Sequence, residues 1–200
     1  MRVGGNHFAS ARLALLAGLL TAAPVFAQTA APRPAPVPPP AAVEAPWSGL
    51  VRMTLVSSDV ERSKRFYADV FGYTASFDGD ITTSSTRILL SLGPHDKARF
   101  VVLNGPAQLS GKPIKATSIG LLQVTRAPRL PVLVQPRGNR LASGQAMMAM
   151  QTADLGRVIA QLRVFRAPIV AGPLVSRDGH ETEIVTQDPD GTRIHVVEQR

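Results

Sequence analysis

Cysteine is absent from the 200 residues of this sequence. The chain therefore has no disulfide bonds, and it has no cysteine on which a lipoprotein anchor could be built. Any folded domain must be held together by its hydrophobic core. The 151 residues from Leu50 onward suffice for this, because a domain of about 150 residues buries roughly 70% of its unfolded surface.

Acidic and aromatic residues are also scarce. The 14 acidic residues face 22 Lys and Arg, which gives a formal net charge of +8 and an isoelectric point near 11.0. A nucleic-acid site usually gathers such charge on one face and adds aromatic side chains. Here Trp47 is the only indole, and the basic residues between the two halves of the chain follow no helical face: Arg126, Arg129, Arg137 and Arg140. We expect no nucleic-acid partner, and a solvated surface attracted to anionic components of the cell envelope.

Long hydrophobic runs are limited to one short segment near the N-terminus. Leu13 to Leu20 is apolar, follows Arg2 and Arg12, and precedes a small-residue end at Ala27. This layout is typical of a secretory signal peptide cleaved after Ala27, and a membrane-spanning helix needs about 20 apolar residues. We expect residues 1–27 to be removed, the mature protein to be periplasmic or secreted, and no integral membrane segment to remain.

Proline dominates the next segment. Gln28 to Ser48 contains seven prolines and six alanines, a composition that favours an extended, polyproline-like chain over a helix or strand. We interpret residues 28–49 as a disordered tether between the signal peptide and the domain. A docking site for a proline-binding partner is the alternative interpretation.

The folded part begins with a strand that runs directly into a helix. Val51 to Val56 alternates, with Met53 and Leu55 on one side, as a half-buried strand does. The spacing then becomes helical up to Gly72, which occupies the position of a left-handed C-cap. Ser58 followed by Glu61 has the spacing of a capping box and predicts the start of the helix.

The same pattern returns 95 positions later, where residues 146–154 correspond to residues 51–59. Leu155, Val158 and Leu162 then form another apolar helical stripe. A similarity at a fixed offset indicates two copies of one small module. Strand alternation sends Met148 and Met150 to the helix-facing side as core residues, and leaves Met147 on the other side.

Shorter signals fill the rest of both modules. Asp188-Pro189-Asp190-Gly191 meets the preferences of a type I turn and predicts a hairpin. A helix is expected at Thr83–Leu92, with a strand as the alternative. Further strands are expected at Tyr73–Phe77, Arg99–Leu103, Ser118–Val124, Pro168–Ala171, Glu181–Val185 and Thr192–Glu198.

The strand and helix from Thr54 to Gly72, together with Asp188-Pro189-Asp190-Gly191-Thr192-Arg193-Ile194, resemble the vicinal oxygen chelate superfamily. This superfamily includes glyoxalase I, extradiol dioxygenases and bleomycin- and fosfomycin-resistance proteins. The resemblance implies an α+β fold at residues 50–200, in which two βαβββ modules form a curved mixed sheet around a shared cavity. Module one spans 50–125, the connector 126–144 and module two 145–200. A homodimer is expected by resemblance only.

The resemblance also implies where a metal would bind. The positions that usually hold ligands are Arg52 in module one, its counterpart Met147, and His195 after the turn. The strand from Ser118 to Val124 contains no Glu, Asp or His. A divalent metal wants three or more N or O ligands, and a guanidinium repels it. We expect no cofactor; a divalent metal held by shifted ligands such as His95 or His180 is the alternative.

These positions suggest a ligand pocket instead. If the geometry implied by the resemblance holds, Arg52, Met147 and His195 face one cavity, with Gln151 and Gln123 nearby. Arginine suits carboxylate or phosphate oxygens, so we predict that these five residues bind a small polar or anionic molecule. The simpler interpretation is that Arg52 lies at the rim of the cavity and that His195 is a strand residue whose hydrogen bonds are made within the protein. The second functional hypothesis is a metal-dependent glyoxalase- or dioxygenase-like enzyme with an atypical ligand set, whose catalytic residues the sequence does not identify.

Overall fold

A computed structural model of the chain describes residues 49–126, 140–176 and 179–199. The predicted signal peptide, nearly all of the predicted tether and most of the predicted connector lie outside these residues.

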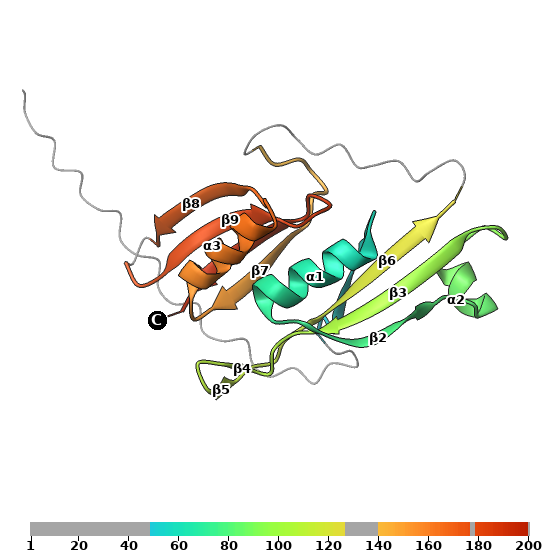
Figure 1. The fold of residues 1–200 in the computed structure, drawn as a ribbon, viewed down its shortest axis with the longest axis horizontal. Helices are drawn as coiled ribbons and strands as arrows, with labels where there is room; N and C mark the ends of the chain where they lie inside the picture. The colour runs from blue at the N-terminus through green and yellow to red at the C-terminus, as the bar shows by residue number, and fades with distance from the viewer. Residues whose placement is uncertain (1–48, 127–139, 177–178, 200) are drawn as a thin grey trace, which may run out of the picture. The chain divides into compact units, whose positions relative to one another are not determined.

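The first module forms one mixed sheet with a helix against it (Figure 1). The sheet order is β1-β6-β3-β2, with β1 parallel to β6 and the other pairs antiparallel. The short strands β4 and β5 form a separate hairpin. The elements are β1 (Arg52–Val56), α1 (Val60–Phe71), β2 (Thr74–Asp80), α2 (Ser84–Leu89), β3 (Lys97–Asn104), β4 (Gln108–Leu109), β5 (Lys112–Pro113) and β6 (Ser118–Thr125).

The second module repeats this topology. Its sheet order is β7-β10-β9-β8, and again the first strand pairs in parallel with the last. The elements are β7 (Met147–Thr152), α3 (Leu155–Val164), β8 (Ile169–Val175), β9 (Thr182–Gln187) and β10 (Arg193–Glu198). The α+β class and the two modules are as predicted. The first strand of each module, β1 or β7, lies at the edge of its sheet with only one neighbour.

At the ends of α1, the predicted C-cap is confirmed and the predicted N-terminal capping box is not. Gly72 is left-handed (φ 72°), and its N–H reaches the carbonyls of Ala68 and Tyr67, as the C-cap pattern predicts. The predicted capping box is wrong. The N-cap is Asp59, whose Oδ1 accepts from the N–H of Arg62 at 3.0 Å. Asp154 caps α3 in the same way, accepting from the N–H of Arg157 at 2.8 Å.

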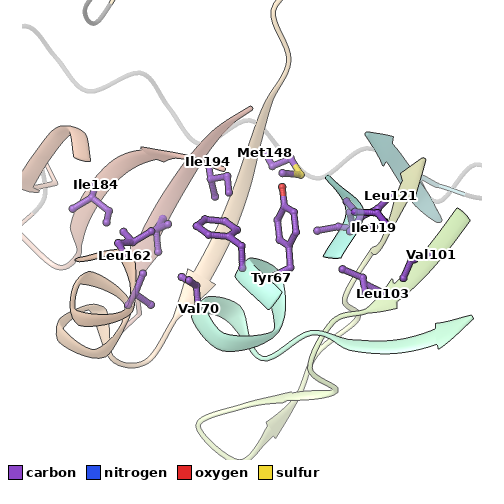
Figure 2. Close-up of a cluster of buried hydrophobic side chains, with 14 of the residues drawn as sticks. Tyr67, Val70, Val101, Leu103, Ile119, Leu121, Met148, Leu162, Ile184 and Ile194 are labelled. Atoms are coloured by element: carbon purple, nitrogen blue, oxygen red, sulfur yellow. The ribbon is translucent and has the colours of Figure 1, made fainter. Parts of the chain in front are cut away.

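One hydrophobic core joins the two modules (Figure 2). Phe66 of α1 is fully buried, and its ring meets Phe165, which follows α3, edge to face with centroids 5.5 Å apart. Figure 2 shows side chains from both sheets and both long helices converging in this cluster, among them Tyr67, Val70, Leu103, Ile119, Met148, Leu162, Ile184 and Ile194. Neither helix therefore buries its apolar stripe within its own module alone.

The predicted hairpin turn between β9 and β10 also connects the modules. Its turn bond is present, since the N–H of Gly191 donates to the carbonyl of Asp188 at 3.0 Å. The carboxylate of Asp190 accepts from Ser57 Oγ at 2.8 Å, from Ser63 Oγ at 3.2 Å and from the N–H of Ser58 at 3.1 Å. The hairpin of module two thus docks on the N-terminal end of α1.

Two strands extend further than the sequence predicts. β2 runs on to Asp80, beyond the predicted end at Phe77, and β8 runs on to Val175, beyond Ala171. The pairing of both strands shifts register along its length, between Ala75 and Phe77 in β2 and between Ile169 and Leu174 in β8. The helix predicted within Thr83–Leu92 is present as α2. Within the described ranges, no helix combines the length and hydrophobicity that crossing a membrane requires.

Candidate ligand site

A cavity of about 850 Å³, which we call the seam cavity, lies between the two modules. Its walls come from the end of α1, the loop that leads into β6, the whole of β7 and the first turn of α3. The ring of Tyr73 and the side chains of Leu109 and Ile114 also line it. The wall is therefore built largely from apolar side chains of both modules.

Every methionine of the chain except Met1 lines this cavity: Met53, Met147, Met148 and Met150. Met147 is half exposed, whereas Met148 is only 9% exposed and belongs to the shared core. Strand alternation places Met147 on one face of β7 and the other two on the opposite face. All three reach the cavity because it follows the edge of the strand, where both faces meet.

Two cationic side chains, Lys115 and Arg157, are part of the wall. In the described part of the chain, neither side chain forms a hydrogen bond or an ion pair within the protein. Asp154, which also lines the cavity, is engaged as the cap of α3. The cavity therefore combines an apolar wall with positive charge that is available to a ligand.

Two of the five predicted site residues, Met147 and Gln151, line the seam cavity; Arg52, Gln123 and His195 do not. Arg52 is exposed on the face of its sheet opposite α1, where its guanidinium carbon lies 5.7 Å from the ring centroid of Phe100. The ring lies over Gly120, where a Cβ would come within 2.8 Å of Phe100 Cζ. Arg52 thus stacks on an aromatic side chain of its own sheet.

Gln123 and His195 both have partners within the protein. The Gln123 amide spans the start of α1, accepting from the N–H of Val60 and donating to the carbonyl of Ser58, each at 3.3 Å. His195 Nε2 lies 2.9 Å from Glu183 Oε2, and the two side chains are 29% and 33% exposed. The contact of His195 with Glu183 is what the simpler interpretation of His195 describes, while ligand binding by Gln123 and His195 stays a prediction.

Sequence reasoning missed much of the cavity wall. The loop from Ile114 to Thr117 carries no motif, and Gly72 was recognised only as the cap of α1 and not as part of a cavity. The usable signal is the repeat itself. The repeat places the first strand of each module at a sheet edge, and Met53 of β1 and Met147 of β7 both line the cavity.

Residues 49–196 match the family model described as the Glyoxalase/Bleomycin resistance protein/Dioxygenase superfamily. The chain belongs to this superfamily. The match spans most of the chain and all of its described elements except the last residues of β10. No curated protein matches the chain.

Solved structures of the superfamily share the fold. A glyoxalase family protein from Bacillus cereus is 14% identical with a TM-score of 0.58, over 77% of this chain and 97% of that one. A glyoxylase/bleomycin resistance protein/dioxygenase domain from Frankia sp. EAN1pec is 15% identical with a TM-score of 0.52, over 77% and 99%. Glyoxalase I from Zea mays is 14% identical with a TM-score of 0.53 over 75% of this chain, which spans only 44% of that enzyme. At these identities the likeness concerns the fold.

The ligand positions that the superfamily resemblance implies do not fit a divalent metal in this chain. Arg52 is a cation stacked on Phe100, Met147 offers a soft thioether, and His195 is engaged by Glu183. Among residues 49–126, 140–176 and 179–199, no three His, Asp or Glu side chains lie close enough together to hold a metal ion. We therefore derive no metal-dependent step for these residues.

Proposed function

We propose that this superfamily domain is exported and binds a small molecule in the seam cavity, one with an apolar body and a polar or anionic end. The observation that carries the proposal is the cavity of about 850 Å³, in which an apolar wall meets two cations that have no partner in the described chain. Ligand pockets are commonly about 300–1,000 Å³, mostly apolar, with a few polar groups that fix orientation.

The wall suits an apolar ligand body. Methionine is unbranched and polarisable, so it adapts to ligands of different shape, and four methionines line this cavity. Tyr73 adds an aromatic surface. Such a wall favours a large apolar ligand body and tolerates different ligand shapes.

The charge suits an anionic end. The planar fork of Arg157 can hold a carboxylate or phosphate through two parallel hydrogen bonds, and Lys115 adds a second positive charge. The exposed Gln151 amide can donate or accept a hydrogen bond at the same wall. A neutral apolar molecule would leave these groups unused and should bind more weakly.

Filling the cavity tests the proposal. Ligands are first identified by native mass spectrometry of protein taken from its source, and by calorimetry with a panel of small carboxylates and phosphates with aliphatic or aromatic bodies. Ala149→Trp places a large ring at the cavity wall and should weaken the best ligand at least tenfold. Ala160→Trp, on the exposed side of α3 and outside the cavity wall, is the matched control and should bind normally.

Charge removal locates the anionic end. Arg157→Gln should weaken an anionic ligand by about tenfold or more, because a hydrogen bond to a charged group contributes about 1.5–3 kcal/mol. Arg52→Ala and His195→Ala, outside the cavity wall, should leave that affinity unchanged. If Arg52→Ala and His195→Ala lose the ligand while Ala149→Trp still binds it, the ligand binds on the open sheet faces and the proposal is overturned.

Export has its own test. The intact mass of protein recovered from the periplasm or culture medium should correspond to a chain that begins at Gln28. Uncleaved protein confined to the cytoplasm would contradict this part of the proposal. A homodimer also stays a prediction.

A further inference from the structure

One edge of β7 has no neighbouring strand in its sheet. β7 pairs only with β10, in parallel. The carbonyl of Thr152 accepts from the N–H of Gln199 at 2.9 Å, just past the end of β10, so the backbone groups of Thr152 face β10. Because successive residues of a strand direct their N–H and C=O groups to opposite sides, the backbone groups of Gln151 and Ala149 face away from β10, toward the open edge.

The seam cavity runs along this open edge. An unbroken run from Met147 to Asp154 lines it, although side chains alternate between faces. Residues from both faces of β7 line it together, so the cavity reaches around this edge, and it extends past the sheet to Val197 of β10 and to Glu181. In the described part of the chain, no hydrogen bond from the N–H of Ala149 or Gln151 is present.

We propose that the ligand of the seam cavity is a short peptide in extended conformation, which adds to the open edge of β7 as a further strand. This inference rests on the function proposed above and specifies its ligand class. Strand addition provides main-chain hydrogen bonds whatever the peptide sequence. The methionines then accommodate varied side chains, since thioethers adapt their shape.

The charges favour a peptide with a free C-terminal carboxylate. Lys115 and Arg157 at the cavity wall match a carboxylate. Glu181, at the same wall, matches a peptide ammonium group. The protein's own segment from Gln28 to Ser48 is a poor occupant, because its seven prolines lack the N–H groups that a strand partner needs.

The test uses the mature protein, residues 28–200, and a library of fluorescein-labelled pentapeptides with free C-terminal carboxylates, read by fluorescence anisotropy. For the best binder, methylating every second amide nitrogen, in each of the two phases separately, should weaken binding at least tenfold in one phase only. Amidating its C-terminus should weaken binding severalfold, and Arg157→Gln should remove the difference between acid and amide.

Protein variants test the same edge from the other side. Ala149→Pro deletes an N–H that faces the cavity and no bond of the β7–β10 ladder, and proline is tolerated at such edge positions. It should weaken the peptide at least tenfold more than Ala149→Val, which also adds bulk at the cavity wall but keeps the N–H. Circular dichroism checks that both variants are folded, and the methylated peptides still test strand addition if Ala149→Pro does not fold.

Three results would overturn the inference. Methylated peptides that bind as well as the parent in both phases exclude strand addition. Binding of small non-peptide carboxylates at the cavity, with no pentapeptide bound, leaves the proposed function standing and removes the peptide. Sedimentation showing a dimer that Ala149→Pro converts to monomer assigns the edge to a second copy of this chain. If Ala149→Trp affects no ligand of any kind, the proposed function itself fails.

Discussion

At the scale of single residues, Tyr67 and Asp188 form a buried contact between the modules. Tyr67 donates to Asp188 Oδ2 at 2.9 Å, and the two residues are 0% and 5% exposed. Burial, together with the negative charge of Asp188, raises the pKa of Tyr67. Burial also raises the pKa of Asp188, although hydrogen bonds from the N–H of Thr192, from Tyr67 and from the N–H of Asp190 oppose it. The charged form of Asp188 is therefore stabilised by these three hydrogen-bond donors.

Tyr67→Phe removes one of these donors and should cost about 1.5–3 kcal/mol of the free energy of unfolding at pH 7, because it weakens the solvation of a buried charge. Urea unfolding measures the cost. Without the Tyr67 bond the pKa of Asp188 rises further above the ordinary value of 3.8. The cost should therefore shrink as the pH falls toward 3.8 through the raised pKa values of the two proteins, because the folded-state carboxyl becomes neutral there.

Tyr73→Phe is the control for this prediction. The hydroxyl of Tyr73 makes one long bond, 3.5 Å to the carbonyl of Thr117, so its loss should cost less than about 1 kcal/mol. Equal costs for the two variants, or a cost for Tyr67→Phe that is the same at pH 7 and pH 3, would show that the bond to Asp188 contributes nothing specific.

At the scale of elements, a network of charges holds α1 against the edge of its sheet. Arg99 of β3 contacts Asp78 of β2 through two nitrogens at 2.7 and 2.8 Å, and reaches Glu61 of α1 at 2.6 Å. Lys64 of α1 contacts Asp78 at 2.8 Å. Hydrogen bonds from Arg99 and then Lys64 lower the pKa of Asp78 to about 2. One carboxylate therefore links three elements.

Asp78→Asn should destabilise the protein by no more than about 1 kcal/mol at pH 7, because the group is near the surface and screened by solvent. The lowered pKa means that this stabilisation is complete above 3.8 and disappears as the pH falls through about 2. Thermal unfolding of wild type and variant should differ at pH 7, converge near pH 2, and also converge in 1 M salt. A difference that persists at pH 2 would mean that the variant acts through packing and not through charge.

The secondary-structure elements differ in how well the sequence predicts them. The alternation of β1 and the glycine cap of α1 are local properties, so they were predictable from neighbouring residues. The repeat was predictable because it is a comparison of two such local patterns. The failure of the capping box could not be predicted from local sequence. Ser58 bonds instead to Asp190, which is 132 positions away, and Glu61 bonds to Arg99. The site was harder still. Alternation tells which face of a strand a residue occupies, whereas the seam cavity has residues of both faces of β7 in its wall. The predicted set therefore includes Met147 and Gln151 of that wall but not Lys115 or Arg157, and ligand binding by all of them stays a prediction.

At the scale of the described domain, the two modules depend on one core. Phe66 and Phe165 meet between them, and the turn at Asp190 docks on the serines beside α1. Separate modules would expose these apolar side chains to water and lose the donors of Asp190. A domain of half the size also buries a smaller fraction of its surface.

We therefore expect neither residues 28–126 nor residues 140–200 to fold alone, and the mature chain to unfold in one cooperative step. Far-ultraviolet and near-ultraviolet circular dichroism should report the same midpoint for the mature chain. Each separate fragment should lack a cooperative transition, and mixing the two should restore one. A fragment that unfolds cooperatively on its own would contradict the shared core.

The gathering of methionines at one cavity has a practical consequence for nuclear magnetic resonance. In a chain that begins at Gln28, all four methionines line the seam cavity. Isotope labelling of methionine methyl groups would then give four signals, every one of them from the cavity wall. Entry of any ligand becomes visible in a spectrum that needs no assignment of the rest of the protein.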